Sequence, residues 1–174
     1  MRTLTARPTA IQDLKKASIL NGVSEESLEQ LAEHGEFKTY KSGDTIMQEG
    51  ENSDTMYIFL EGEVEVSKNL TLKLSGKGFG QVEKSMTKLK ASTASVFGEM
   101  SLFQTEPRSA TVSATADCLL FEISRDAFRR FCGQDPRSGI AILEKIASIL
   151  SSRLRKSNED VLKLSTALSI ALNR

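Results

Sequence analysis

The segment FGEMSLFQTEPRSATV (97–112) combines a glycine–glutamate pair with an arginine that has small neighbours. Gly98 lacks a Cβ, so its backbone allows a ligand to approach closely. The carboxylate of Glu99 can accept hydrogen bonds from sugar hydroxyls, and the planar fork of Arg108 suits a phosphate. The segment therefore predicts a site for a small phosphorylated sugar ring. On composition alone, a surface loop with an exposed Glu–Arg ion pair is the alternative.

The other residues of this segment fit the same interpretation. Residues 100–103, beginning with Met100, can form one helical turn whose free N–H groups suit an anion. Ser109 and Ala110 are small enough to admit a ligand beside Arg108.

Short segments with alternating apolar and polar residues surround the site between residues 37 and 123. Most of them are separated by turn signals such as KSGD and SGKGFG. We expect eight or nine strands in an antiparallel sandwich or barrel rather than in βαβ units. GKGFG (76–80) is expected to be a hairpin turn. Helices are expected before the strands at 11–20 and 23–35, the second with Ser24 as its N-cap and Gly35 as its C-cap.

The helical period returns after Ile123. A short helix is expected at 126–131, and Asp135-Pro136 then begins a long helix of roughly 50 Å. Its apolar residues alternate at spacings of three and four, interrupted only by Ser157: Ile140, Leu143, Ala147, Leu150, Leu154, Val161, Leu164, Leu168 and Ala171. Packing on the chain's own domain explains the first half of this helix. The distal half predicts a parallel homodimeric coiled coil.

These patterns divide the chain into three parts. Residues 1–10 are expected to be a flexible N-terminus, residues 11–135 to hold helices and a β-domain, and residues 136–174 to form the long C-terminal helix that mediates dimerisation.

Composition restricts the class of protein. The chain has 174 residues and no formal net charge, which gives no general attraction to nucleic acid or anionic membrane. Cys118 and Cys132 fit a reducing compartment, and the sequence shows neither a signal peptide nor an apolar run of membrane-spanning length. We therefore expect a cytoplasmic protein. No nucleophile–base pair or metal-ligand cluster is apparent, so we expect neither an enzyme nor a bound metal or cofactor. The lone His34 and the basic run 153–156 are interpreted as structural and as a solvated helix face.

Three parts of the sequence together resemble one family. FGEMSLF (97–103) and PRSATV (107–112) are similar to the phosphate-binding cassette of the cyclic-nucleotide-binding domain, and GDTIMQEGENSDTMYIFLEGEVEV (43–66) is similar to its first strands. Catabolite activator protein, the regulatory subunits of cyclic-AMP-dependent kinase and nucleotide-gated channels share this domain. The resemblance implies a mainly β fold: an antiparallel β-roll of the jelly-roll type, with N-terminal helices and a long C-terminal helix. Ser101 and residues 90–95 depart from the commoner family pattern.

The resemblance also implies roles for single residues. Gly98 and Glu99 would bind the ribose 2′-hydroxyl, and Arg108 would bind the cyclic phosphate. Backbone N–H groups near Ser101, and Ser109, would assist Arg108. Leu102 would couple the cassette to helices near Phe128 and Phe131.

The base is expected to be read by the long helix. The resemblance places Ser157 and Asn158 where two polar residues reach adenine, one from each subunit, although Ser157 could equally set the register of a coiled coil. Ser109 resembles a feature of cyclic-GMP-binding members. We expect cyclic AMP, with cyclic GMP as the alternative ligand.

The function expected is a regulatory module that changes conformation on binding its ligand and signals to an unidentified partner, without binding nucleic acid or membrane. The alternatives are a DNA-binding regulator without its reader domain, since only about ten residues follow Leu164, and a degenerate interaction domain that no longer binds nucleotide.

Overall fold

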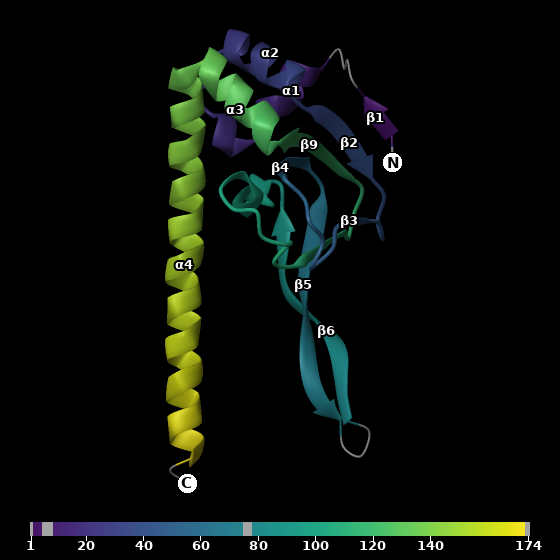
Figure 1. Ribbon diagram of the computed structural model, residues 1–174, viewed down its shortest axis with the longest axis vertical. Coiled ribbons are helices and arrows are strands. Elements are labelled where there is room, and N and C mark those ends of the chain that lie inside the picture. Colours follow the sequence, from purple (N-terminus) through teal and green to yellow (C-terminus); the bar gives the residue numbers. More distant parts are fainter. Residues whose placement is uncertain (1, 5–8, 75–77, 173–174) are drawn as a thin grey trace.

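The computed structural model describes residues 2–4, 9–74 and 78–172, and its strands form two antiparallel sheets that close into a β-roll (Figure 1). The five-stranded sheet has the order β1-β2-β9-β4-β7, and the four-stranded sheet has the order β3-β8-β5-β6. The strands are β1 (Arg2–Leu4), β2 (Glu36–Tyr40), β3 (Thr45–Met47), β4 (Thr55–Glu61), β5 (Glu63–Leu74), β6 (Gly78–Lys90), β7 (Val96–Phe97), β8 (Thr111–Ala114) and β9 (Cys118–Ser124). The predicted fold class is confirmed.

Helices cover one end of the roll. They are α1 (Ala10–Leu14), η1 (Ser18–Leu20), α2 (Glu25–Glu33), α3 (Arg125–Gln134) and α4 (Pro136–Leu172), while η2 (Glu99–Leu102) is the short turn between β7 and β8. In Figure 1, α1, α2 and α3 gather at the same end, and α4 runs alongside the roll and extends beyond it. One apolar cluster joins these helices to the five-stranded sheet, and a second fills the interior of the roll. The two clusters fix the strands that carry the candidate site.

The start of the chain differs from the prediction of a flexible segment at 1–10. Residues Arg2–Leu4 form β1 and pair antiparallel with β2, with Leu4 opposite Phe37. The free edge of β2 offers unpaired N–H and C=O groups, and pairing of the backbone satisfies them whatever the side chains are. Propensity alone does not reveal such an edge.

The N-terminal helices are shorter than expected. The helix predicted at 11–20 ends at Leu14, and η1 follows as a separate turn. The N-cap at Ser24 is confirmed, since its hydroxyl accepts from the N–H of Ser27 at 3.1 Å. The C-cap is His34 instead of Gly35, and a Cβ on Gly35 would lie 2.4 Å from the ring of Phe121. Gly35 thus allows close packing of the chain on β9.

The two strands after Gly62 are longer than the sequence pattern indicated. β5 is one continuous strand of twelve residues, and the expected hairpin turn at 76–80 overlaps β6, which already begins at Gly78. The remainder of that predicted turn, at 76–77, lies outside the described residues. The β5–β6 hairpin projects away from the roll (Figure 1).

Capping and an apolar contact fix where α4 begins. As predicted, Asp135 is the N-cap: its carboxylate accepts from the N–H of Ser138 at 3.1 Å. The hydroxyls of Ser27 and Ser138 and the N–H of Ser138 lower the pKa of Asp135. Ile142 and Ile146 are buried against the rest of the molecule. This region of α4 is therefore firmly placed.

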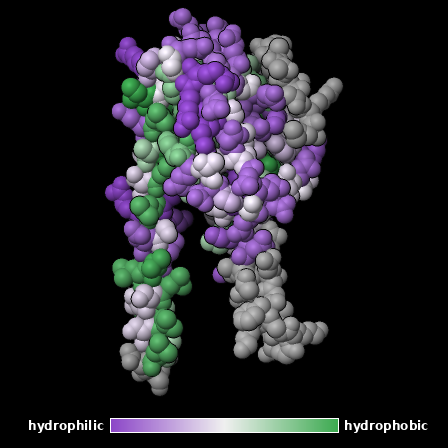
Figure 2. Space-filling view, viewed as in Figure 1, coloured by the Kyte–Doolittle hydropathy of each residue, from purple (hydrophilic) through white to green (hydrophobic). Residues whose placement is uncertain are grey.

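The predicted apolar seam covers only part of the face of α4 that packs on the rest of the molecule. Ile140, which belongs to that seam, is largely exposed, whereas Ile142 and Ile146 are buried. Four distal seam residues are each at least 60 % exposed: Leu154, Val161, Leu164 and Leu168. Figure 2 shows apolar side chains gathered along α4, including its distal half. In the first half, Leu143 and Leu150 of the seam are partly buried against the same apolar cluster, whereas the distal half of the seam is exposed. None of the helices described is both long and apolar enough to cross a bilayer.

Candidate functional site

The site is built around Gly98, which has a left-handed backbone with a φ of 70°. A Cβ at this position would lie 2.8 Å from Nη1 of Arg108 and 3.3 Å from the carbonyl oxygen of Thr55. Glycine is therefore required twice, by the backbone conformation and by the close approach of the guanidinium. The turn at Gly98 joins β7 to η2 and brings Glu99 and Ser101 inside the roll.

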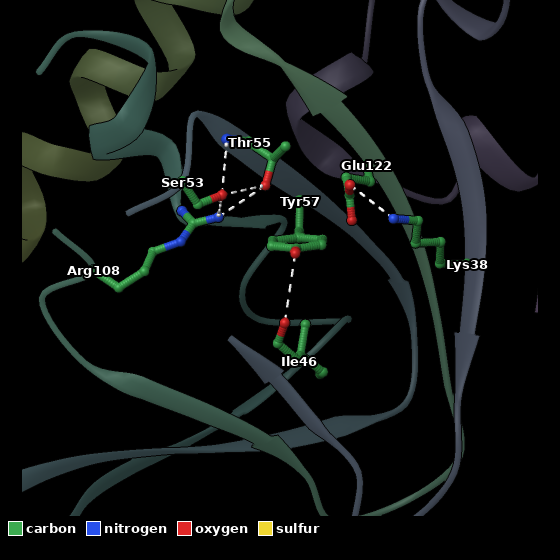
Figure 3. A network of polar contacts seen from close by, with 7 residues as sticks. All are labelled: Lys38, Ile46, Ser53, Thr55, Tyr57, Arg108 and Glu122. Atoms are coloured by element: carbon green, nitrogen blue, oxygen red, sulfur yellow. Dashed lines mark hydrogen bonds and ion pairs between the residues drawn. The ribbon is translucent and has the colours of Figure 1, made fainter. Parts of the chain in front are cut away.

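Arg108 points into the roll and is only 5 % exposed. Its Nη1 donates to the hydroxyl of Ser101 at 2.9 Å and, more weakly, to the carbonyl oxygen of Gly98 at 3.4 Å. Its Nη2 donates to the hydroxyls of Ser53 at 2.9 Å and Thr55 at 2.8 Å (Figure 3). The buried Nε has no hydrogen-bond partner among the described residues.

The aromatic ring of Tyr57 lies beside the guanidinium of Arg108, 5.8 Å from its central carbon. Burial raises the pKa of the Tyr57 hydroxyl, which donates to the carbonyl oxygen of Ile46 at a long 3.5 Å (Figure 3). The ring face offers a weak attraction to the cation without neutralising it. Arg108 is thus a buried cation with polar and aromatic but uncharged neighbours.

Glu99, by contrast, has a charged partner. It is 3 % exposed, and its Oε1 accepts from Nη1 of Arg153 at 2.7 Å. Nη2 of Arg153 also donates to the carbonyl oxygen of Val96 at 2.8 Å. Arg153 belongs to α4, so this ion pair joins the C-terminal helix to the carboxylate expected to bind ribose.

A third arginine fixes the backbone of the cassette (97–112). Arg125, the first residue of α3, donates from Nε to the carbonyl oxygen of Ser101 at 2.6 Å and from Nη2 to that of Gln104. The same helix is capped by Ser124, whose hydroxyl accepts from the N–H of Ala127 at 3.2 Å. The end of η2 and the start of α3 are therefore tied together.

The predicted coupling residues are brought into one apolar cluster. Leu102, Phe128 and Phe131 are all buried in the cluster that also contains Ile142 and Ile146 of α4. The packing is continuous from η2 through α3 to α4. The coupling role of these side chains remains a prediction.

Three of the predicted ligand-binding residues line the outer part of the cassette. Met100 is about half exposed, and the hydroxyl of Ser109 lies 3.9 Å from its sulfur. Ala110 is half-buried immediately before β8. Gly98, Glu99, Ser101 and Arg108 lie deeper, so the structure brings the predicted cassette residues together.

Ser157 and Asn158 are not brought to the cassette within this chain. Both lie on the exposed distal half of α4, and neither side chain forms a hydrogen bond with another described residue. Their expected role in reading the base remains a prediction that depends on a second chain.

Several residues of the site were missed by the sequence analysis, namely Ser53, Thr55, Tyr57, Arg125 and Arg153. The first three lie within the segment that carried the resemblance, but their hydroxyls and ring gave no sign that they face Arg108. Residues 153–156 are exposed, as the interpretation of a solvated face requires, but the head group of Arg153 also reaches the buried Glu99. A helix cation facing a cassette carboxylate cannot be recognised until the helix is docked.

A groove of about 510 Å³ lies beside the cassette, between α4 and the segment before β7. Hydroxyls line both of its sides: Ser148 and Ser152 on α4, and Thr93 and Ser95 opposite. Ile149 and Leu150 of α4 still pack against the apolar cluster at this level, and Arg153, the partner of Glu99, lines the same groove.

Comparisons with known proteins agree with this geometry. Residues 37–135 match the family described as the cyclic nucleotide-binding domain. A CRP-like cAMP-activated global transcriptional regulator of Mycobacterium tuberculosis is 26 % identical over 151 residues, which cover 87 % of this chain and 61 % of the regulator. The chain thus spans less than two thirds of that relative's length.

Solved structures give the same result. A cyclic nucleotide-binding domain from Methylobacillus flagellatus superimposes with a TM-score of 0.68 at 25 % identity, covering 88 % of this chain and 80 % of that domain. The regulatory domain of Toxoplasma gondii PKA, in a co-crystal with cAMP, has a TM-score of 0.61 at 29 % identity. The match covers 80 % of this chain and 49 % of that one. The family match spans more than half of the chain and includes Gly98, Glu99 and Arg108, so this chain belongs to the cyclic nucleotide-binding domain family.

Proposed function

We propose that the chain is a cyclic AMP receptor module that regulates a partner and catalyses no reaction itself. The observation that carries this proposal is Arg108, a buried cation whose hydrogen-bond acceptors are all uncharged and whose Nε is unpaired among the described residues. A buried cation without a counter-charge is unfavourable, and a phosphate supplies the missing charge. Relatives whose names include cAMP support this nucleotide.

The route by which binding is signalled follows from the Glu99–Arg153 ion pair. A ribose hydroxyl that donates to Glu99 must share this carboxylate with Arg153 or displace it, because Arg153 already donates to Oε1. We expect either change to alter how α4 is held beside the groove that Arg153 lines. A partner that recognises α4 would then sense the ligand.

The exposed seam of α4 supports homodimerisation. Leu154, Val161, Leu164 and Leu168 follow a heptad spacing on the exposed half of the helix, with Ser157 in the same seam. In a parallel coiled coil, a second copy would cover this seam and bring its Ser157 and Asn158 near the first cassette. We expect Leu164→Glu to convert a dimer to a monomer by light scattering, and Glu159→Gln, at an exposed position outside the seam, to leave the dimer unchanged.

The proposed location is the cytoplasm. Cys118 and Cys132 are free thiols, as expected for a reducing compartment.

Calorimetric titration with cyclic AMP and cyclic GMP tests the ligand. We expect the wild type to bind cyclic AMP more tightly than cyclic GMP. Arg108→Ala should cost about 3 kcal/mol or more, roughly 100-fold in Kd, because the phosphate loses a buried charged partner. Arg130→Ala, which removes an exposed arginine from α3, is the matched control. Absence of binding to either nucleotide by the folded wild type would reject the proposal in favour of a degenerate domain.

A further inference from the structure

The outer nitrogen of Arg108 is held by two hydroxyls that precede and begin β4. Nη2 donates to Ser53 at 2.9 Å and to Thr55 at 2.8 Å, and the two hydroxyl oxygens are 3.1 Å apart (Figure 3). The oxygen of Ser53 also lies 3.4 Å from the N–H of Thr55. Two side chains and the guanidinium therefore form a closed triangle of hydrogen bonds.

We propose that Ser53 and Thr55 are positioning residues for ligand binding: they fix the orientation of the Arg108 guanidinium while leaving its charge for the phosphate. This inference rests on the proposed function and extends it to residues outside the cassette.

The hydrogen-bond acceptors of Arg108 are all neutral. The hydroxyls of Ser53, Thr55 and Ser101 and the carbonyl of Gly98 all accept from Arg108, and none carries a charge. Among the residues that the structure describes, no carboxylate forms an ion pair with Arg108. A carboxylate would fix the orientation and also neutralise the cation, whereas a hydroxyl fixes only the orientation. The charge therefore stays available to a bound anion.

The segment that carries the hydroxyls of Ser53 and Thr55 is itself anchored. Thr55 is opposite Ser124 of β9 in the five-stranded sheet, so its position is set by the sheet. The neighbouring backbone also holds Arg108 from the other end: the N–H of Arg108 donates to the carbonyl of Glu51 at 2.8 Å, and the N–H of Gly50 donates to the carbonyl of Arg108 at 2.9 Å. The segment 50–55 thus fixes both the backbone and the head group of Arg108.

This anchoring matters because Arg108 itself lies in the loop between η2 and β8, outside regular structure. An arginine side chain has many rotamers, and each that is populated without ligand lowers the fraction of molecules ready to bind. Removal of one hydroxyl should therefore reduce affinity through Arg108, although neither hydroxyl needs to touch the nucleotide.

Isosteric substitution tests the inference by calorimetry with cyclic AMP. We expect Thr55→Val, which keeps the shape and removes the hydroxyl, to raise Kd about tenfold. Thr55→Ser retains a hydroxyl and should stay within about twofold of the wild type. Ser53→Ala is a second, independent probe with an expected rise of about fivefold. Thr87→Val, at an exposed position on β6, is the matched control.

A double-mutant cycle separates positioning from a merely structural contribution. In an Arg108→Lys background, whose side chain lacks the planar fork, Thr55→Val should change Kd by less than about twofold. An equal tenfold loss in both backgrounds would show that Thr55 acts on the fold and would overturn the inference. Thermal melting followed by circular dichroism identifies folded variants, and Ser53→Ala with its own cycle decides the question if Thr55→Val does not fold.

The two proposals fail differently. A folded wild type that binds neither cyclic AMP nor cyclic GMP overturns the proposed function together with this inference. A wild type that binds cyclic AMP, with Thr55→Val and Ser53→Ala both unchanged, overturns the inference and leaves the proposed function intact.

Discussion

The two buried charged side chains of the cassette, Arg108 and Glu99, are both nearly inaccessible to solvent but are anchored to different parts of the molecule. Arg108 is held by hydroxyls from β4, its preceding loop and η2, and all of its hydrogen-bond acceptors are neutral. Glu99 is held by a cation from α4. One charge is held within the roll, and the other is balanced by the C-terminal helix.

This difference separates affinity from signalling. The unbalanced cation at Arg108 favours an anion whatever the position of α4, since none of its partners comes from that helix. The balanced carboxylate at Glu99 links whatever binds there to Arg153. Changes around Arg108 should therefore alter how tightly the ligand is held, and changes around Arg153 should alter how α4 responds.

Gly98→Ala is expected to weaken cyclic AMP binding more than any change except Arg108→Ala, because Gly98 adjoins both charges. The new Cβ combines a left-handed backbone with a 2.8 Å approach to the guanidinium, for a cost of about 2–4 kcal/mol in cyclic AMP binding, or roughly 30-fold or more in Kd. Gly133→Ala in α3 has no neighbouring atom within 4 Å of its new Cβ and should leave binding unchanged. Similar affinities of both variants in calorimetry would contradict this account of Gly98.

Glu99→Gln addresses the carboxylate alone. Loss of a charged acceptor should weaken cyclic AMP binding by about 1.5–3 kcal/mol, at least roughly tenfold. The 2′-deoxy analogue lacks the hydroxyl expected at Glu99, so the substitution should affect its Kd much less. Glu106→Gln, at an exposed position in the same cassette, is the control. Equal losses of affinity for cyclic AMP and for its 2′-deoxy analogue would show that the ribose hydroxyl does not bind Glu99.

Arg153→Met cuts the connection to α4 and leaves Arg108 untouched. The buried Glu99 then loses its charged partner, and we expect the free energy of unfolding of the ligand-free protein to fall by about 1–2 kcal/mol in urea titrations. Arg155→Met, also on α4 but exposed, should have no such effect. If Arg153→Met abolished cyclic AMP binding as completely as Arg108→Ala, the separation of affinity from signalling would be wrong.

Tyr57 should contribute less than any of these residues. The Tyr57 ring lies 5.8 Å from the guanidinium carbon, a contact worth about 0.5–1 kcal/mol. Tyr57→Leu should therefore weaken cyclic AMP binding by about two- to fivefold, while Tyr57→Phe keeps the ring and should remain close to the wild type. Calorimetry at a temperature where both variants are folded compares them directly.

Ionisation of the two tyrosine hydroxyls with rising pH tests whether their side chains are buried. Burial raises the pKa of both Tyr40 and Tyr57, the only tyrosines of the chain, above the ordinary value of about 10. The folded protein thus resists ionisation, and the stability that this neutral state gives is present below pH ~10 and lost as pH rises through the folded-state pKa values. Ultraviolet titration should show no phenolate until pH exceeds ~10. Ionisation with the ordinary pKa of about 10 would show that the two rings are exposed to water.

The family, the β-roll and the cassette could be inferred from the amino-acid sequence alone. These features depend on local requirements that residue types reveal directly: a glycine where no Cβ fits at Gly98, alternation along the strands, and caps such as Ser24 and Asp135. The start of α4 was predictable for the same reason.

Only the tertiary structure decided which side chains surround the two charges. Ser53 and Thr55 are separated from Arg108 by more than fifty residues, and Arg153 is separated from Glu99 by a similar interval, so no local pattern records either contact. The packed face of α4 was equally hidden, because Ile142 and the seam residue Ile140 are both apolar and only docking on the roll determines which is buried. Electrostatic and packing partners depend on distances in space, which residue spacing along the chain does not specify.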